Sequence, residues 1–128
     1  MQAGRLGDRP TCGRCKAALF PDHPAALSDA SFQGFIERSE LPVIVDFWAP
    51  WCGPCRAMAP QFEAAARHSS GRALFAKLDT EQSPQTAARF GIRSIPTVIA
   101  FQGGRELARE SGAMSERQLL DWLGGSAR

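Results

Sequence analysis

The stretch VIVDFWAPWCGPC, residues 43–55, decides the fold. Its first six residues are almost all β-branched or aromatic, which predicts a short strand buried on both faces, as in the middle of an α/β sheet. Residues 49–55 then bring two prolines and a glycine, which predict a turn that opens into a helix of about residues 55–68. Pro60 falls inside that helix and should bend it, because proline lacks the amide hydrogen and clashes with the preceding turn.

Strand and helix signals alternate through the rest of the chain. The further elements that we expect are an edge strand at 24–28, a helix capped by Ser28 or Asp29, a strand at 73–78, a helix at 83–90, strands at 97–101 and 106–110, and a helix at 115–123. Helical crossovers make their flanking strands parallel, and the Gly-Gly turn at 102–105 makes the last two strands antiparallel. The prediction is an α/β fold with a central mixed β-sheet flanked by helices on both faces.

The chain has 128 residues, enough for one domain with a core of its own. Its formal net charge of +2 resides in residues 1–23, so the remainder is neutral, which argues against nucleic acid and an anionic membrane as partners. No stretch approaches the ~20 apolar residues of a membrane-spanning helix, and the first residues lack the apolar core of a secretory signal. We therefore expect a monomeric, cytoplasmic protein that meets its partners through apolar and backbone contacts.

Four cysteines form two Cys-x-x-Cys pairs, Cys12/Cys15 and Cys52/Cys55. A secreted disulfide scaffold would spread its cysteines over distant segments, so tight pairs indicate redox chemistry or metal binding. Half of a zinc site, or chance, would explain a lone pair. The second pair, however, follows an apolar strand and opens a helix, and this context favours the redox interpretation.

Disulfide exchange requires a thiolate, whereas a free cysteine thiol titrates near pH ~8.5. Cys52 is expected at the helix N-terminus, where unpaired backbone amides and the helix dipole favour negative charge, so we predict that its pKa is lowered. Cys55 lies one turn further and deeper. Cys52 would attack a disulfide of a partner, and Cys55 would then attack Cys52 and release the reduced partner. Pro54 fits the first helical turn, and Gly53 lets a client chain approach the sulfur.

The segment VDFWAPWCGPC, residues 45–55, resembles the active-site segment of the thioredoxin family, and its Trp-Cys-Gly-Pro-Cys signature is highly specific. Matching segments follow in the same order at 75–79 (FAKLD), 92–97 (IRSIPT) and 112–115 (GAMS). The second of these resembles the loop that carries the cis-proline of that family. The resemblance covers about residues 26–124. It implies the thioredoxin fold and a protein-disulfide reductase that needs no cofactor for the redox reaction.

The resemblance also implies roles for individual residues. Cys52 would be the nucleophile and Cys55 the resolving cysteine. Asp46 would be a buried carboxylate behind the pair, with a raised pKa, that shuttles the Cys55 proton through water. Lys77 would be its neighbour across the sheet. A satisfied carboxylate at a strand end is the alternative for Asp46, but an aspartate among apolar residues is costly unless something requires it.

A client-binding groove around the cysteines is a further implication. Pro96 would follow a cis peptide bond and lie against the disulfide, leaving the backbone of Ile95 free to pair with an extended client. The alternative is a trans proline that starts a strand. Trp48 is expected in the core. The apolar rim around Cys52 would comprise Trp51, Gly91, Ile95 and Gly112.

Residues 1–23 form a predicted appendage before a thioredoxin domain of residues 24–128. The segment TCGRC, with Cys12 and Cys15, resembles half of a zinc ribbon and is most similar to the thioredoxin-2 branch, which places a four-cysteine zinc module before the redox domain. Only one pair is present here, whereas a closed structural zinc site takes four protein ligands. Four hypotheses remain open: a module without its first pair, His23 as a third ligand, one zinc shared by two chains, or a metal-free thiol or disulfide pair.

The leading functional hypothesis is a protein-disulfide reductase that acts on disulfide-containing client proteins. The resemblance implies that an NADPH-dependent thioredoxin reductase would recharge it. A disulfide oxidase or isomerase on the same fold is one alternative, and its reduction potential would be much more oxidising. Another is a non-catalytic binding partner that uses the apolar rim, whose binding would survive replacement of Cys52 by serine.

Overall fold

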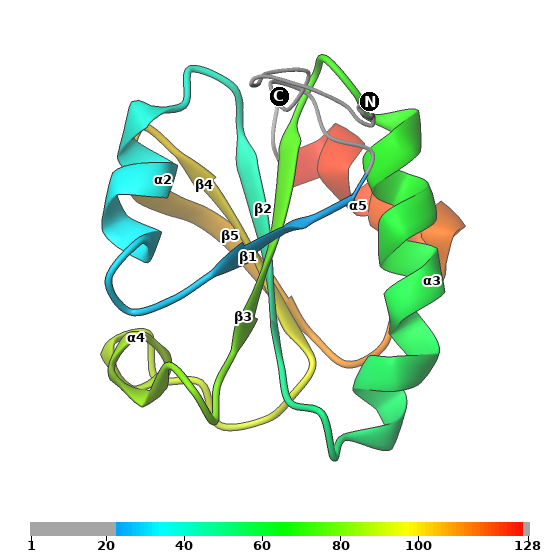
Figure 1. The fold of residues 1–128 in the computed structure, drawn as a ribbon. Coiled ribbons are helices and arrows are strands. Elements are labelled where there is room, and N and C mark those ends of the chain that lie inside the picture. Colours follow the sequence, from blue (N-terminus) through cyan, green and yellow to red (C-terminus); the bar gives the residue numbers. More distant parts are fainter. Residues whose placement is uncertain (1–22, 127–128) are drawn as a thin grey trace, which may run out of the picture.

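A five-stranded mixed sheet runs through the middle of the protein in the computed structural model, which describes residues 23–126 (Figure 1). The elements, in chain order, are β1 (Ala25–Leu27), α2 (Phe32–Arg38), β2 (Val43–Trp48), α3 (Gly53–His68), β3 (Leu74–Asp79), α4 (Pro84–Arg89), β4 (Thr97–Gln102), β5 (Arg105–Ser111) and α5 (Glu116–Ser126). This succession confirms the predicted alternation of strands and helices.

The strands are ordered β1-β3-β2-β4-β5 across the sheet. β1 and β2 both pair in parallel with β3, while β4 runs antiparallel to β2 and to β5. β2 and β4 are fully inside the sheet and are buried along nearly their whole length, as their continuous apolar runs predict. The predicted mixed sheet is therefore confirmed, with helical crossovers between parallel strands and a hairpin between β4 and β5.

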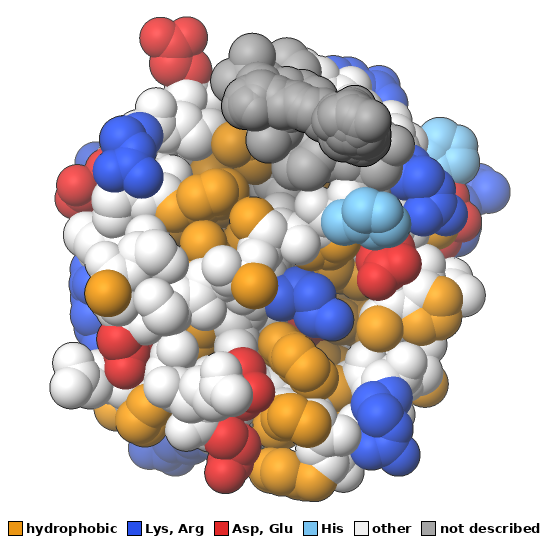
Figure 2. Space-filling model, viewed as in Figure 1, with side chains coloured by type: hydrophobic (Ala, Val, Ile, Leu, Met, Phe, Trp, Pro, Cys, Tyr) orange, Lys and Arg blue, Asp and Glu red, His pale blue; other side chains and the backbone are white. Residues whose placement is uncertain are grey.

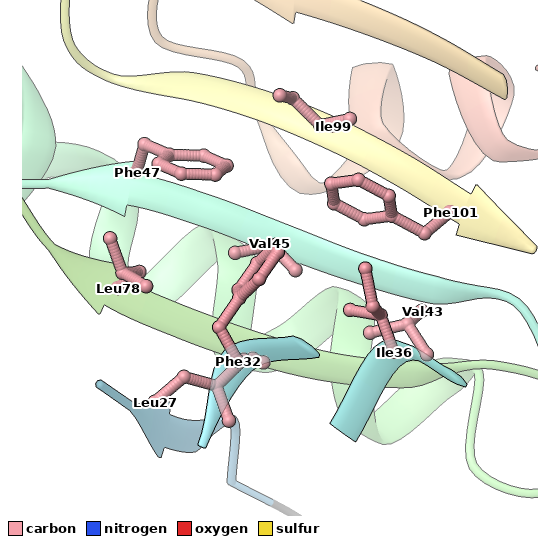
Figure 3. Close-up of a cluster of buried hydrophobic side chains, with 10 residues drawn as sticks. Leu27, Phe32, Ile36, Val43, Val45, Phe47, Leu78, Ile99 and Phe101 are labelled. Carbon is pink, nitrogen blue, oxygen red and sulfur yellow. The ribbon is translucent and has the colours of Figure 1, made fainter. Parts of the chain in front are cut away.

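Helices cover both faces of the sheet, α2 and α4 on one and α3 and α5 on the other (Figure 1). On the first face, Phe32 of α2 lies 5.5 Å from Phe101 of β4 and 5.4 Å from Phe90 at the end of α4, between ring centroids. Figure 3 shows this cluster, in which side chains of β1, β2, β3 and β4 meet those of α2. On the second face, Met58 and Phe62 of α3 are buried against the sheet. Burial of these two faces holds the layers together.

Two serines exchange hydrogen bonds in the turn just before α2. The backbone N–H of Ser31 donates to Ser28 Oγ at 3.2 Å, and the N–H of Ser28 donates to Ser31 Oγ at 2.9 Å. This reciprocal pair resembles a capping box, but the N-cap residue of α2 is Ser31, which makes no side-chain capping bond, so the prediction of Ser28 or Asp29 as the cap was wrong. The alternative cap, Asp29, has a different partner: its carboxylate accepts hydrogen bonds from Gln85 and Thr86, in the first turn of α4.

α3 begins two residues earlier than the predicted start near residue 55, because Gly53 and Pro54 are already helical. The helix continues through Pro60 to His68. Proline suits the first turn, where no intrahelical amide bond is required. None of the helices in the described part of the chain combines the length and apolarity needed to cross a bilayer.

Candidate active site

Cys52 and Cys55 form a disulfide at the start of α3, with their Cα atoms 5.2 Å apart. Cys52 occupies the N-cap position with extended backbone, and Cys55 lies in the first turn. Both side chains are buried, and they pack with Ala49 and the half-buried Trp48. The strand-to-helix junction predicted from the sequence therefore brings the two sulfurs together as a bonded pair.

The helix N-terminus offers donors to the sulfur of Cys52. The backbone N–H of Cys55 donates to Cys52 Sγ at 3.2 Å. Once the disulfide is reduced, the same amide and the positive end of the α3 dipole would stabilise a thiolate on Cys52. A Cβ built on Gly53 would meet nothing within 4 Å, so open space lies beside the pair.

Asp46 is fully buried on β2, the strand that leads into the cysteine turn. Neither of its carboxylate oxygens has a hydrogen-bond partner among the described residues. Because side chains alternate along a strand, Asp46 faces the same side of the sheet as Ile44, which packs against α3. Burial raises the pKa of Asp46 to about 7, and the positive charge of Lys77 opposes part of that rise.

Lys77 lies opposite Asp46 in the register of β2 and β3, as predicted. Its ammonium group lies 4.4 Å from the ring centroid of Trp48, a cation–π contact. Trp48 is half-buried, so the prediction that it lies in the core was wrong. The reason is its position at the last residue of β2, where the sheet ends and the ring contacts both Lys77 and the cysteine cluster.

The segment before β4 faces the cysteines. The Ile95–Pro96 peptide bond is cis, as predicted, and the carbonyl oxygen of Ile95 lies 3.8 Å from Cys52 Sγ. Two hydroxyl contacts brace this turn: Thr97 Oγ1 donates to the carbonyl of Ser94 at 2.7 Å and lies 3.0 Å from Ser111 Oγ. Sequence reasoning missed the hydroxyl pair, because its partners lie 14 residues apart and neither belongs to a recognisable motif.

Three of the predicted rim residues differ in their contacts and in their exposure. Gly112 donates its N–H to the carbonyl of Pro96 at 2.8 Å, which ties the end of β5 to the cis-proline turn. Trp51 is 66% exposed beside Cys52, the largest exposure among bulky apolar side chains of the described residues. Gly91 follows α4 with a φ of 64°, a conformation that suits glycine, and its N–H donates to the carbonyl of Ala88 at 3.0 Å.

Further contacts hold the cysteine turn in place. Arg56 Nη1 donates to the carbonyl of Pro50 at 2.9 Å, across the turn that contains both cysteines. The backbone N–H of Thr80 donates to the carbonyl of Trp48 at 2.8 Å. These bonds tie the turn to α3 and the end of β2 to the end of β3.

Metal-ligand clusters are absent from residues 23–126: no group of three or more His, Cys, Asp or Glu side chains there could hold an ion. Cys12 and Cys15 lie outside the described residues, and so does the predicted appendage except for His23, which is exposed. The only other cysteines of the chain are joined in the disulfide.

Known proteins have sequences similar to this chain. The family model described as Thioredoxin matches residues 23–124. The chain is 44% identical to Thioredoxin C-3 of Corynebacterium nephridii over 119 residues, which are 93% of this chain and 81% of that protein. It is 46% identical to a thioredoxin of Synechocystis over 97 residues, or 76% of this chain and 91% of that protein.

The chain belongs to the thioredoxin family. It is therefore a thiol–disulfide oxidoreductase, a protein-disulfide reductase whose exchange chemistry resides in two cysteines and requires no cofactor. Members of this family generally work with thioredoxin reductase and with proteins that contain disulfides. The matched residues, 23–124, include all five strands of the sheet and residues of the helices on both of its faces, so the predicted thioredoxin fold is confirmed.

Proposed function

We propose that Cys52 is the attacking cysteine of this reductase, Cys55 the resolving cysteine and Asp46 the proton acceptor for Cys55. One arrangement carries the proposal. A disulfide lies at the N-terminus of α3, and the buried carboxylate of Asp46, on the strand that leads into it, has no hydrogen-bond partner among the described residues. A pKa of about 7 lets Asp46 take up and release a proton near neutral pH.

The cycle begins with the reduced dithiol. The Cys52 thiolate attacks one sulfur of a client disulfide, so that a mixed disulfide forms and the other client sulfur leaves as a thiolate, which takes a proton from water. Cys55 then passes its proton through water to Asp46 and attacks Cys52 Sγ. The mixed disulfide breaks, the second client sulfur leaves with both electrons of that bond, and the Cys52–Cys55 disulfide shown here is the product.

The rim would hold the client during these steps. An extended client chain can pair with the backbone beside the cis bond at Ile95, while the exposed ring of Trp51 offers apolar contact area. Gly112 supports the rim through its bond to Pro96. Gly53 leaves room for the client sulfur to reach Cys52.

Insulin reduction with dithiothreitol as electron donor tests the cysteine assignment. Cys52→Ser is expected to abolish turnover, whereas Cys55→Ser should trap a covalent complex with the client, visible by non-reducing electrophoresis. The reverse pattern, with the trapped complex formed by Cys52→Ser, would contradict the assignment. Ser70→Ala, at an exposed turn remote from the disulfide, serves as a control that should retain full turnover.

The role of Asp46 needs a measurement of the resolving step. Asp46→Asn is expected to slow release of the client from the mixed disulfide by about 10²–10⁴-fold, the usual contribution of a positioned acid–base group. The attack step should change less. Equal rates of release in the wild type and the variant would remove the proton-acceptor role while leaving the cysteine assignment intact.

The recharging partner in this proposal is an NADPH-dependent thioredoxin reductase. An assay with thioredoxin reductase, in which disulfide reduction is coupled to oxidation of NADPH, tests this partner directly. The wild type should support NADPH oxidation, whereas the Cys52→Ser variant should not. A reducing compartment such as the cytoplasm suits such a cycle, because thiols are kept reduced there. An oxidase or isomerase would instead show a much more oxidising reduction potential, and a non-catalytic partner would keep its binding in the Cys52→Ser variant.

Residues 24–128 would form the catalytic domain, preceded by the appendage of residues 1–23. The match to Thioredoxin C-3 spans 119 residues and so must extend into the appendage. This extension supports kinship with a branch that carries an N-terminal module, such as the thioredoxin-2 branch. Metal analysis of the purified protein tests its zinc: about one zinc per chain would support a metal site at Cys12 and Cys15, and its absence would leave a metal-free pair.

A further inference from the structure

A groove lies at the end of α3 that is remote from the cysteines. It is a cavity of about 450 Å³ between the last turn of α3, the loop before β3, and α5. Ala73, Leu120 and Leu123 line it and are partly buried against the core of this face of the sheet. We call it the α3–α5 groove. Its volume falls within the ~300–1,000 Å³ typical of binding pockets.

The positive charge of Arg72 borders this apolar groove. His68 also lines it and already contacts the carboxylate of Glu116, while Arg72 Nη2 donates to the backbone carbonyl of His68, which holds the guanidinium at the groove. Figure 2, drawn from the side of Figure 1, shows basic, histidine and acidic side chains together in the region where α3 ends. An occupant that combines apolar side chains with one negative charge would complement such a site.

The chain enters the described fold next to this groove. β1 is parallel to β3 with Ala25 opposite Ala76, so the chain that precedes β1 runs beside the start of β3 and the loop before it. Neighbouring strands lie ~4.8 Å apart. His23, where the described part of the chain starts, lies two residues before Ala25, and Ala73, which lines the groove, lies three residues before Ala76, the partner of Ala25.

The sequence just before that point has the composition that the groove requires. Leu19 and Phe20 are adjacent large apolar residues in an otherwise polar segment, and Asp22 follows them. Phe20 and Leu19 stand three and four residues before His23, a span of at most ~14 Å of extended chain, so both side chains can reach the groove from this attachment point. Attachment also gives the segment an effective concentration in the millimolar range, which favours a site on its own chain over one on a second copy.

We propose that Leu19 and Phe20 pack into the α3–α5 groove of their own chain, with Asp22 beside Arg72. Docking would hold the N-terminal cysteines away from the catalytic pair. α3 has 16 residues and is therefore ~24 Å long, with Cys52 at its start and the groove at its end. Cys15 lies four residues before Leu19, at most ~14 Å of extended chain. The Cys15 sulfur would then be kept from exchange with Cys52.

Nuclear Overhauser contacts in the intact, oxidised protein test the proposal. Ring protons of Phe20 should show contacts to methyl groups of Leu120 and Leu123. A sample that mixes differently labelled chains separates contacts within one chain from those between two. Absence of these contacts, or contacts only between chains, would overturn the proposal; the second result would assign the groove to another copy.

A pair of variants gives an independent readout. Replacing both Leu19 and Phe20 by serine should shift the backbone amide resonances of residues 72–74 and 120–123 and speed their hydrogen exchange severalfold. Leu6→Ser is the matched control, because it removes an apolar side chain of the same appendage far from the attachment point, and it should leave those amides unchanged. Equal effects of the two changes, or no effect of either, would contradict docking. Insulin reduction should stay unchanged in both, since neither alters the cysteine site.

Discussion

Both carboxylate oxygens of Asp46 are buried without a hydrogen-bond partner among the described residues, and burial raises the pKa of this group to about 7. In the unfolded chain the same carboxyl loses its proton near pH ~4. Between these two values the folded protein binds the extra proton, so the free energy of unfolding falls as the pH rises from about 4 to about 7. Asp46 thus lowers stability at neutral pH, which is the cost of keeping a proton acceptor behind the disulfide.

Asp46→Asn should therefore stabilise the protein at high pH. Each pKa unit corresponds to ~1.4 kcal/mol, so the gain in the free energy of unfolding should approach roughly 4 kcal/mol at pH 8 and be small at pH 4. Urea unfolding of the oxidised wild type and variant at both pH values checks this. The same difference between the two proteins at pH 4 and pH 8 would contradict the raised pKa of Asp46.

Lys77 sets how far that pKa rises. Its positive charge favours the ionised carboxylate and so lowers the pKa of Asp46 against the effect of burial. Lys77→Gln should move the pKa of Asp46 upward, and a ¹³C titration of the Asp46 carboxyl carbon measures the change. Arg105→Gln is the matched control, because it removes a positive charge from exposed β5, and it should leave that titration nearly unchanged. A downward shift in the Lys77 variant would contradict the electrostatic account.

At the scale of elements, the short helix α4 depends on a residue from another part of the chain. Its N-cap residue, Ser83, makes no side-chain capping bond. Asp29 supplies acceptors instead, for the N–H and hydroxyl of Thr86 at 2.8 and 2.7 Å and for the N–H of Gln85 at 3.3 Å. A six-residue helix is too short to be stable alone, so this bond set helps to hold the segment that leads to the cis-proline turn.

Asp29→Ala should loosen α4 without disturbing the cysteine turn. Backbone amides of residues 85–90 are expected to exchange faster with solvent, and the thermal midpoint should fall, because the first turn loses its acceptors. Asp121→Ala is the control, since that carboxylate lies on the exposed side of α5 in a pair with Arg117. If exchange in α4 stayed at the wild-type rate, the hydrogen bonds that Gln85 and Thr86 donate to Asp29 would have no structural role.

The elements themselves could be predicted because each carries its own local signal. A run such as residues 43–48 is apolar along its whole length, and only a strand inside a sheet buries both of its faces. The contacts between elements could not be predicted in this way. Asp29 reads as a cap for the helix that follows it, yet its partners lie 56 and 57 residues further on. Trp48 reads as core, and only the register, which pairs it with Asp79 at the ends of β2 and β3, shows that it lies at the end of the sheet.

At the scale of the whole molecule, one sheet separates two chemically different sides. The side covered by α2 and α4 is filled by aromatic and aliphatic side chains, as Figure 3 shows. The side covered by α3 and α5 carries Asp46, Lys77 and the disulfide at the end where the parallel strands finish, and the α3–α5 groove at the other end. A ligand site beyond the carboxyl ends of parallel strands is the usual position in open α/β sheets.

Residues 24–128 carry no net charge with which to attract clients over a long range. The net charge of +2 resides in residues 1–23, and the rest of the chain is neutral. Exposed charges are screened from each other when they lie more than one Debye length apart. The Debye length is ~10 Å in 0.1 M salt. Client binding by apolar and backbone contacts at Trp51 and Ile95 should therefore respond weakly to ionic strength.

The kcat/KM for an uncharged peptide disulfide should thus change by less than about twofold between low and high sodium chloride, whereas electrostatic steering alters association rates by ~10-fold or more. A peptide of the same length with added acidic residues serves as the comparison, and its rate should differ from the uncharged one only modestly at low salt. A steep fall with salt for the acidic peptide would mean that charged groups near the rim, rather than the apolar and backbone contacts, control how clients are bound. Trp51→Ala separates the two explanations, because loss of the apolar contact should lower kcat/KM equally at both salt concentrations.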